Sequence, residues 1–294
     1  MSLFFECLHD IASEMGILCK VYSNYIVELS DSGNGKTVLV HGHEFSLNRG
    51  SSILLCKDKA FTYDLLTRAG IPAVPHYAFF SPLHPLTSAK VSREGTLVGI
   101  LTCANALGRG PIDNTNIDVV IKPLTGQAGV DVFRCTTPKE VEQATSRIFG
   151  HFSSVAVCPY KKIQTEYRIV VFMQSARAVY SKQLPHAAAP DDQSSSEVSA
   201  NEWRHNFRLG ATPMVFLNSP DDKLFAELSE MAVQTARALG LDVAMVDIVD
   251  VAGECKMVLE VNTSVSMNVL LKMPEYKHIA KHIYRDIVTE CLKR

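Results

Sequence analysis

The chain has 294 residues, which is enough for one large domain or two smaller ones. Hydrophobic residues make up 47% of it, which allows a sizeable core, and a net charge of −2 argues against a nucleic-acid or membrane-surface partner. No apolar stretch reaches membrane-spanning length, and the N-terminus has acids where a signal peptide has bases. The eight cysteines are scattered without a CxxC pair, so we expect reduced thiols in a cytoplasmic protein.

The first 50 residues predict a small α+β element. Helical spacing begins at Phe4 and stops at Gly16. Three short strands are predicted next, at 18–22, 25–29 and 37–41. His41 and His43 follow alternate positions there, and a structural and a substrate-facing role explain them equally well. The block is too short to be half of a nucleotide-binding fold.

Two lysines lie at the predicted start of a second helix, which begins near Asp58 and ends at Gly70. Lys57 and Lys59 oppose the helix dipole there, which suggests an anionic ligand nearby. Lysines that simply point to water explain the pattern equally well.

A glycine loop follows the strand 118–123, which carries Lys122 near its end. Gly126 and Gly129 bracket the loop, and the chain returns as a strand at 130–135. Glycines allow close backbone approach, and their N–H groups can bind phosphate. Taken alone, an ordinary hairpin is the commoner explanation.

The middle of the chain predicts a helix at 138–149 and then strands at 154–160, 165–172 and 176–183. The low-complexity segment 185–201 is expected to act as a lid. After it, Arg204, Asn206 and Arg208 share one face if the segment is extended. That arrangement suits phosphate or carboxylate, although a polar sheet face is the simpler explanation.

The last third predicts a helix at 219–239 with Pro220 in its first turn, a strand pair and a terminal helix at 276–292. The strands, 243–251 and 256–261, carry Asp247, Glu260 and Asn262 in apolar surroundings. Oxygen ligands on a rigid hairpin suit Mg²⁺, which also takes substrate phosphates and water. A solvated hairpin with its acids on the wet face is the alternative.

The order of these segments resembles the ATP-grasp enzymes from about residue 51 to residue 271. The matching runs are KDKAFTYDLLTRAGIP, VVIKPLTGQAGVDV, CPY, EYR, RHNFRLG, DVAMVDI and LEVNTS. The similarity is greatest to the carboxylate–amine ligases related to ribosomal-protein glutamate ligase, the glutathione synthetases and the ATP-grasp part of cyanophycin synthetase. It implies an α+β ATP-grasp fold, in which subdomains 51–157 and 158–294 grip ATP after the short N-terminal element 1–50.

The resemblance also implies which residues bind the nucleotide. The phosphates would meet two lysines and a closing loop: Lys59, Lys122, Gly126, Gln127 and Gly129. Backbone groups of Tyr160 and Lys161 would pair with adenine, and Glu166 would bind the ribose. The family often has a Gln-Glu pair where this chain has Cys158-Pro159, so the side-chain part of adenine recognition differs here.

The remaining implied roles concern the reacting groups. The transferring phosphate and the acyl phosphate would be held by Arg168, Arg204 and Asn206. The divalent cation, Mg²⁺ or alternatively Mn²⁺, would be held by Asp247, Glu260 and Asn262. Arg204 and Arg208 favour an anionic substrate. Pro-Gly often follows that Asn in the family, whereas Thr263 to Ser266 follow it here, which alters the substrate end.

The implied activity is ATP-dependent carboxylate–amine ligation, in which an amide or peptide bond forms through an acyl phosphate. Its substrates would be a small-molecule or peptide carboxylate and an amine, and a homodimer is one arrangement the enzyme could take. Two alternatives share the scaffold: a small-molecule kinase and an ATP-binding module without catalysis. A structural domain without a ligand is the blandest alternative.

Overall fold

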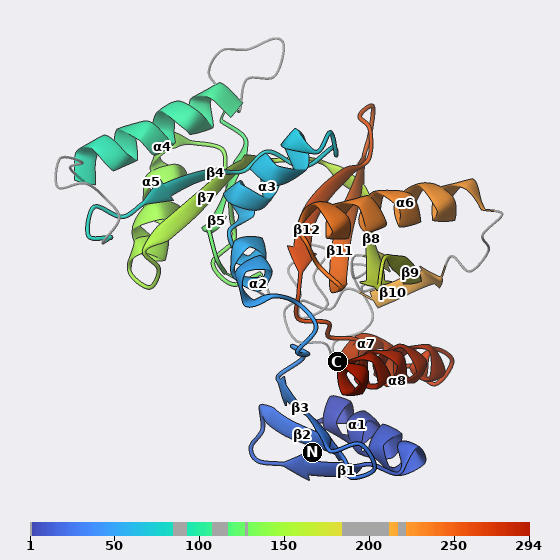
Figure 1. The fold of residues 1–294 in the computed structure, drawn as a ribbon. Helices are drawn as coiled ribbons and strands as arrows, with labels where there is room; N and C mark the ends of the chain where they lie inside the picture. Colours follow the sequence, from blue (N-terminus) through green and yellow to red (C-terminus); the bar gives the residue numbers. More distant parts are fainter. Residues whose placement is uncertain (1, 85–92, 108–116, 127–128, 184–211, 217–221) are drawn as a thin grey trace, which may run out of the picture.

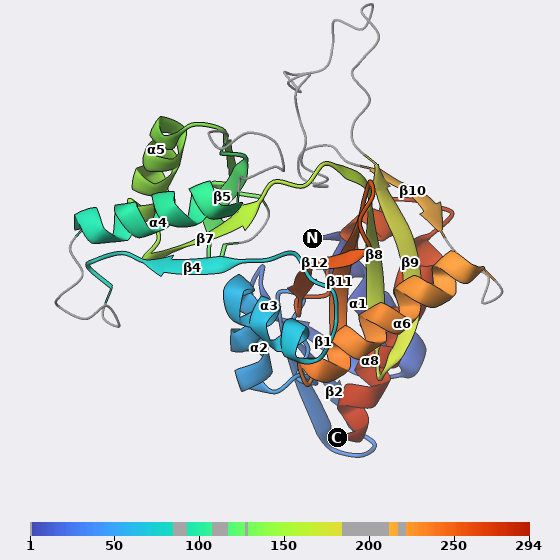
Figure 2. The same cartoon turned by 90° about the horizontal axis from the view of Figure 1, so that it is seen from above.

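The structure is a computed structural model that describes residues 2–84, 93–107, 117–126, 129–183, 212–216 and 222–294. The strands of the described residues form three antiparallel sheets, of three, four and five strands (Figures 1 and 2). Their orders are β1-β2-β3, β4-β7-β5-β6 and β10-β9-β8-β11-β12. This mixed α+β architecture was predicted from the sequence.

The N-terminal element contains one helix and the smallest sheet. Its members are α1 (Leu3–Met15), β1 (Leu18–Val21), β2 (Ile26–Asp31) and β3 (Lys36–His41). The Ser2 side chain accepts the Phe5 N–H at the start of α1, and Gly16 ends the helix with φ of 68°. The buried face of α1 packs in one core with α8 and part of the five-stranded sheet.

The four-stranded sheet is covered by two helices on one face. It consists of β4 (Tyr77–Phe80), β5 (Val119–Pro123), β6 (Phe133–Cys135) and β7 (Ser154–Pro159). The helices are α4 (Arg93–Leu107) and α5 (Pro138–Phe149). Ile100, Val141 and Ile148 of these helices are fully buried against the sheet, which forms a core of its own.

A capping box fixes the start of α5. The Thr137 hydroxyl accepts the Glu140 N–H at 3.3 Å, and the Glu140 carboxylate accepts the Thr137 N–H at 3.1 Å. We therefore expect Thr137→Ala to lower the free energy of unfolding by about 1 kcal/mol, because a backbone donor loses its partner. Urea titration measures the loss, and Lys139→Ala, exposed in the same turn, should change stability by a smaller amount. Equal losses in the two variants would argue against the cap.

The five-stranded sheet lies at the centre of the larger body in Figure 2. Its strands are β8 (Ile163–Phe172), β9 (Ser175–Gln183), β10 (Thr212–Phe216), β11 (Val243–Val251) and β12 (Met257–Asn262). Helix α6 (Lys223–Ala238) packs on one face. The other face is covered in part by α7 (Asn268–Leu271), α8 (Lys277–Lys293) and the N-terminal element. The uncovered part of that face is left for a binding site.

Helices α2 (Gly50–Lys57) and α3 (Lys59–Arg68) connect the N-terminal element to β4 and pack on the α6 side. The predicted start of α3 near Asp58 is confirmed, whereas the placement of Lys57 at that start and the predicted start of α6 at 219 are wrong. Lys57 ends α2 instead of starting α3, because the Asp58 side chain caps α3. Helix α6 begins at Lys223, where the Asp222 side chain accepts the Leu224 N–H, and Pro220 lies outside the described residues. The subdomain boundaries at 50 and 157 stay predictions.

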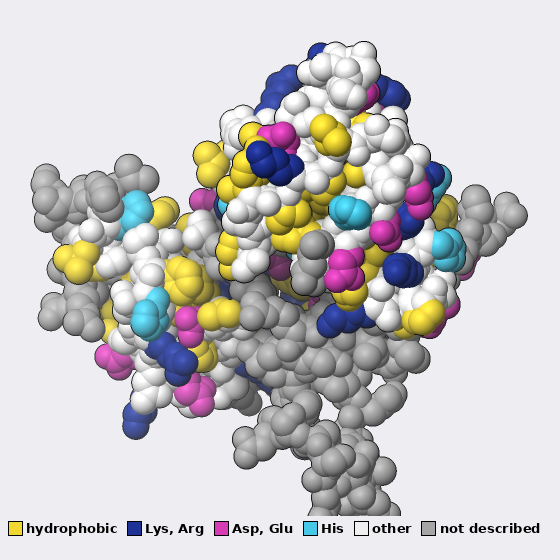
Figure 3. Space-filling model, turned by 90° about the horizontal axis from the view of Figure 1, so that it is seen from below, with side chains coloured by type: hydrophobic (Ala, Val, Ile, Leu, Met, Phe, Trp, Pro, Cys, Tyr) yellow, Lys and Arg dark blue, Asp and Glu magenta, His cyan; other side chains and the backbone are white. Residues whose placement is uncertain are grey.

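Three further features of the molecule are the apolarity of its helices, the state of its cysteines and the distribution of its surface charge. None of the helices that the structure describes is long and apolar enough to cross a bilayer. All eight cysteines are free, and five of them are buried. Charged side chains of both signs are interspersed with hydrophobic ones on the face that Figure 3 shows.

Candidate active site

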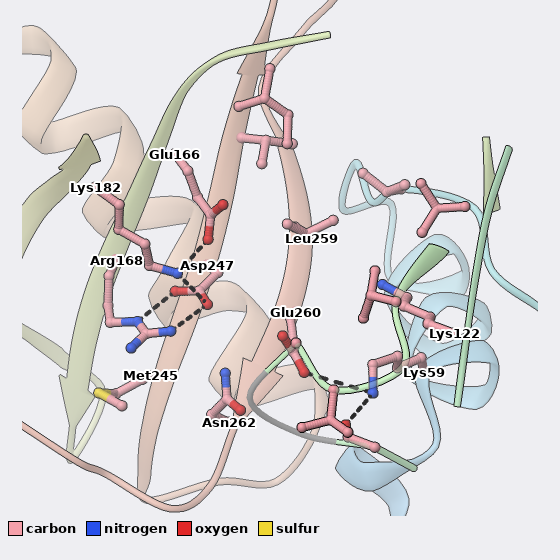
Figure 4. Close-up of a pocket in the computed structure, with 18 of the residues that line it drawn as sticks. Lys59, Lys122, Glu166, Arg168, Lys182, Met245, Asp247, Leu259, Glu260 and Asn262 are labelled. Atoms are coloured by element: carbon pink, nitrogen blue, oxygen red, sulfur yellow. Dashed lines mark hydrogen bonds and ion pairs between the residues drawn. The ribbon is translucent and has the colours of Figure 1, made fainter. Parts of the chain in front are cut away.

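A pocket of about 820 Å³ opens between the four-stranded and five-stranded sheets. This volume is in the range of small-molecule sites. Most of the residues that the sequence singled out line it: Lys59, Lys122, Gly126, Gly129, Tyr160, Lys161, Glu166, Arg168, Asp247, Glu260 and Asn262. The side chains therefore converge on one cavity, although they come from four strands, one helix and two loops (Figure 4).

The floor of the pocket is the open face of the five-stranded sheet. Asp247 of β11 lies directly between Arg168 of β8 and Glu260 of β12 in the strand register. Since side chains at paired positions lie on the same face, these three groups form one row across the sheet. Met245 and Asn262 form the next row.

A β-bulge places an extra side chain on this floor. Asp247 pairs with Glu260 but Ile248 pairs with Val258, so Leu259 has no partner of its own on β11. As a result Leu259 and Glu260, although adjacent in sequence, both line the pocket. Simple alternation along β12 predicts opposite faces for them.

Four charged groups, three of them buried and Arg168 partly buried, are joined on the floor (Figure 4). Arg168 Nε and Nη2 each donate to one oxygen of Asp247 at 2.7 Å. Lys182 Nζ lies 2.8 Å from Asp247 and also donates to Glu166. Asp247 and Lys182 are 2% and 4% exposed, so water screens this network little.

The pKa values follow from this arrangement. Burial alone would raise the pKa of Asp247, but Arg168 and Lys182 lower it below its ordinary value. Burial also raises the pKa of Glu166, and Lys182 opposes that rise without cancelling it. Burial alone would lower the pKa of Arg168, and Asp247 raises it above its ordinary value. The network is therefore ionised at Asp247 and Arg168 near neutral pH.

Asp247, Glu260 and Asn262 are the side chains that could hold a divalent cation. All three line the pocket with oxygen-bearing groups, which are the ligands a hard cation prefers. Among the described residues no three His, Cys, Asp or Glu side chains form a metal-binding group. The two carboxylates with one amide fit a cation that takes its other ligands from phosphates and water. Asp247 would then exchange part of its contact with Arg168 and Lys182.

The two lysines that were predicted to bind phosphate lie on the opposite wall. Lys59 Nζ donates to the carbonyl of Gly126 at 2.7 Å and of Leu124 at 3.3 Å, and lies 3.8 Å from Glu260. Burial lowers the pKa of Lys59, and the Glu260 carboxylate opposes this change. Lys59 thus fastens the glycine loop to the floor in this state. Lys122 points into the same space from β5.

The glycine loop needs its first glycine. A Cβ added at Gly126 would lie 2.8 Å from the Pro123 ring, closer than carbon atoms approach. Gly129 has φ of 71°, a backbone conformation that side chains disfavour. At both positions a side chain would be disfavoured, which agrees with the prediction that these glycines allow close backbone approach. Gln127 lies outside the described residues.

The wall at the far end of β7 is apolar and contains Tyr160. Arg134 stacks on the Tyr160 ring at 3.5 Å and donates both a 2.8 Å and a 2.9 Å bond to Asp118. The Tyr160 N–H donates to the Asp118 carbonyl. Lys161 forms a two-bond ion pair with Glu254 at the tip of the β11–β12 hairpin. This segment links the two larger sheets.

Lys182 and His43 also line the pocket; Lys182 was not predicted there, and for His43 the sequence left a structural and a substrate-facing role open. A lysine inside an apolar strand is the same signal that singled out Asp247, and Lys182 carries it on β9. His43 lies in the turn after β3, and nothing in its neighbourhood predicts contact with residues more than 200 positions away. Arg204, Asn206, Arg208 and the predicted lid lie outside the described residues.

Comparison with known proteins supports the fold. A model of the RimK-like ATP-grasp domain matches residues 193–287. Similar solved structures include a D-alanine–D-alanine ligase from Bacillus anthracis, with 19% identity and a TM-score of 0.57 over 85% of this chain and 70% of that one. The chain has the ATP-grasp fold. No curated protein sequence matches it.

Two further ATP-grasp structures show the same likeness. The ligase PsnB, solved with a minimal precursor, has 14% identity and a TM-score of 0.53 over 83% of this chain and 63% of that one. A bifunctional glutathione synthetase from Pasteurella multocida has 16% identity and a TM-score of 0.53. It is covered to 44% of its length, and this chain to 97%. At such identities the likeness shows the fold and does not assign the residues of the site.

Proposed function

We propose that the protein is an ATP-dependent ligase that joins a carboxylate to an amine. The amide or peptide bond forms through an acyl phosphate, and the substrate is an amino acid or a peptide. The observation that carries the proposal is the convergence of Lys59, Lys122, Asp247, Glu260 and Asn262 on one pocket. Cations for a triphosphate and oxygen ligands for Mg²⁺ or Mn²⁺ face each other across it. The ATP-grasp fold and the RimK-like match support the same chemistry.

The described residues divide the work as follows. Lys59 and Lys122 bind the phosphates, and the glycine loop closes over them. Asp247, Glu260 and Asn262 hold the divalent cation, which when bound neutralises charge on the phosphates. Backbone groups of Tyr160 and Lys161 pair with the adenine base, and Glu166 binds the ribose. These roles extend the resemblance to the side chains that line the pocket.

The reaction has two displacements. A carboxylate oxygen attacks the γ-phosphorus, the bond to the β-phosphate oxygen breaks and ADP leaves. The amine nitrogen then attacks the acyl carbon, the carbon–oxygen bond to phosphate breaks, and the amine loses a proton. Arg168 or Arg204 holds the tetrahedral oxyanion that forms when the amine attacks, before phosphate leaves. No nucleophilic side chain is needed, and exclusion of water by the loops protects the acyl phosphate.

A product inventory tests the proposal. ADP release is screened with pairs of amino acids and dipeptides, and mass spectrometry identifies any product. Ligation gives ADP, free phosphate and a new amide. ADP with a phosphorylated substrate and no free phosphate would instead identify a kinase, and absence of ADP with every pair would indicate an ATP-binding module without catalysis.

Lys122→Met is expected to raise the KM for ATP about tenfold or more, because a charge-assisted contact to phosphate is lost. The side chain lies inside the pocket, so bulk water does not replace its contact with phosphate. Steady-state ADP release at varied ATP measures the effect. Lys57→Met, at the exposed end of α2, is the matched control and should leave the KM as in the wild type. An unchanged KM in Lys122→Met would remove this lysine from the phosphate site.

A further inference from the structure

The pocket has a second end, on the side away from Tyr160. Along β12 and the segment that follows it, alternate side chains line the pocket: Glu260, Asn262, Ser264, Ser266 and Asn268. Val249, Asp247 and Met245 follow the same direction on β11. The row therefore runs from the apolar wall, past the charged floor, to a neutral polar end at Asn268. His43 of the N-terminal element lines this end as well.

The N-terminal element is attached to this end at several points. The Val265 N–H donates to the His43 carbonyl at 3.2 Å, and the Thr263 hydroxyl donates to Glu44 at 2.6 Å. The His43 ring also packs 4.3 Å from the Phe4 ring of α1. These contacts hold His43 in one place, as a positioning residue needs to be held.

One polar atom at this end is left without a partner. The Asn268 amide nitrogen lies 3.2 Å from His43 Nε2 and donates to it when this ring nitrogen carries no proton. This bond turns the Asn268 amide oxygen away from the imidazole. Among the described residues the oxygen is buried and has no hydrogen-bond donor. A buried acceptor without a donor costs free energy, which a ligand with an N–H group would recover.

We propose that this end binds the attacking primary amine, whose N–H groups donate to Asn268 Oδ1, and that His43 positions the Asn268 amide. The proposal rests on the ligase function above. A neutral imidazole does not repel an ammonium group, and burial lowers the pKa of His43 despite the bond from Asn268. Lys272 is exposed at the rim, where it can meet an anionic group on the same molecule.

The position also suits the reaction. Asn268 continues the row of Glu260 and Asn262 beyond Ser264 and Ser266, so an amine held there enters from the end of the pocket that faces the region where the acyl phosphate forms. The N-terminal element is then part of the active site and takes part in the choice of amine. It closes the pocket at the end that the second substrate occupies.

Kinetics with three variants test the proposal. Asn268→Leu and His43→Ala should raise the KM for the amine about tenfold or more, since each loses the oriented acceptor. His43→Gln, whose amide oxygen can accept from Asn268, should recover part of the loss. His41→Ala, exposed two residues away, is the control and should behave as the wild type. Positional isotope exchange in ATP, measured with the carboxylate and without amine, should fall far less than ligation does.

The outcomes separate this proposal from the ligase function. An unchanged KM for the amine, or an equal rise in the KM for ATP, overturns the amine site. If the wild type ligates no pair, the ligase function fails, and histidine NMR with glycinamide tests the site directly. Glycinamide should shift the His43 ring signal in the wild type and not in Asn268→Leu. N-acetylglycine, which has no amine, should not shift it, and absence of a glycinamide shift would overturn the site.

Discussion

Glu260→Gln is expected to lower ATP turnover about a hundredfold or more while the protein remains folded. The substitution keeps the shape of the side chain and removes the charge that a divalent cation requires. Glu260 is partly exposed, and its nearest cation, Lys59, is 3.8 Å away, so loss of the charge disturbs little packing. Steady-state ADP release measures turnover, and Mn²⁺ paramagnetic resonance with ATP present measures metal affinity without relying on activity.

Glu227→Gln is the matched control, because Glu227 forms a surface ion pair with Lys256 outside the pocket. Turnover and metal affinity should both be unchanged in it. Asp247→Asn should also abolish turnover, but it removes a charge that holds Arg168 and Lys182, so it should also lower stability. Wild-type turnover and metal affinity in Glu260→Gln would refute the metal assignment.

Lys182→Met is expected to lower the free energy of unfolding by about 3 kcal/mol or more, because it leaves Glu166 buried without its cation. The effect should depend on pH. Burial already raises the pKa of Glu166, and loss of Lys182 raises it further. The folded state then binds the proton more tightly than the unfolded state. Stability should therefore fall as pH rises from about 4.3, the unfolded value for Glu, through the higher folded pKa.

A double variant isolates the pair. Lys182→Met with Glu166→Gln should be more stable at neutral pH than Lys182→Met alone, since the uncompensated carboxylate is gone. Lys256→Met is the control and should cost less than about 1 kcal/mol, as exposed ion pairs do. Urea titrations across pH give the free energies of unfolding of the wild type and of these three variants. A pH-independent loss in Lys182→Met would show that Glu166 is not the group left unpaired.

The hairpin at the heart of the site was predictable from the sequence. A β-branched run, a turn with Gly253 and a second apolar run specify β11 and β12, and the first was predicted with its observed bounds, Val243–Val251. The lysines and the glycine loop were also predicted to face an anion. These features depend on local spacing, which the order of residues contains directly.

Other parts of the site depend on which strands become neighbours. Arg168 and Asp247 are 79 positions apart, and their pairing follows from β8 lying beside β11 in the sheet. No pattern within either strand indicates that order, so the ion pairs of Asp247 with Arg168 and Lys182 were not predicted. His43 entered the pocket for the same reason, because the N-terminal element docks on the segment after β12.

The irregular position at Leu259 has a consequence for changes in chain length. Deleting this residue would close the gap in the ladder while Glu260 stayed opposite Asp247, so the cavity would lose an apolar contact and keep its acid. Inserting a residue between Glu260 and Asn262 would instead turn one of them toward α6. The positions of β12 before and after Glu260 therefore differ in whether a change in chain length would preserve the acid and the amide in the pocket.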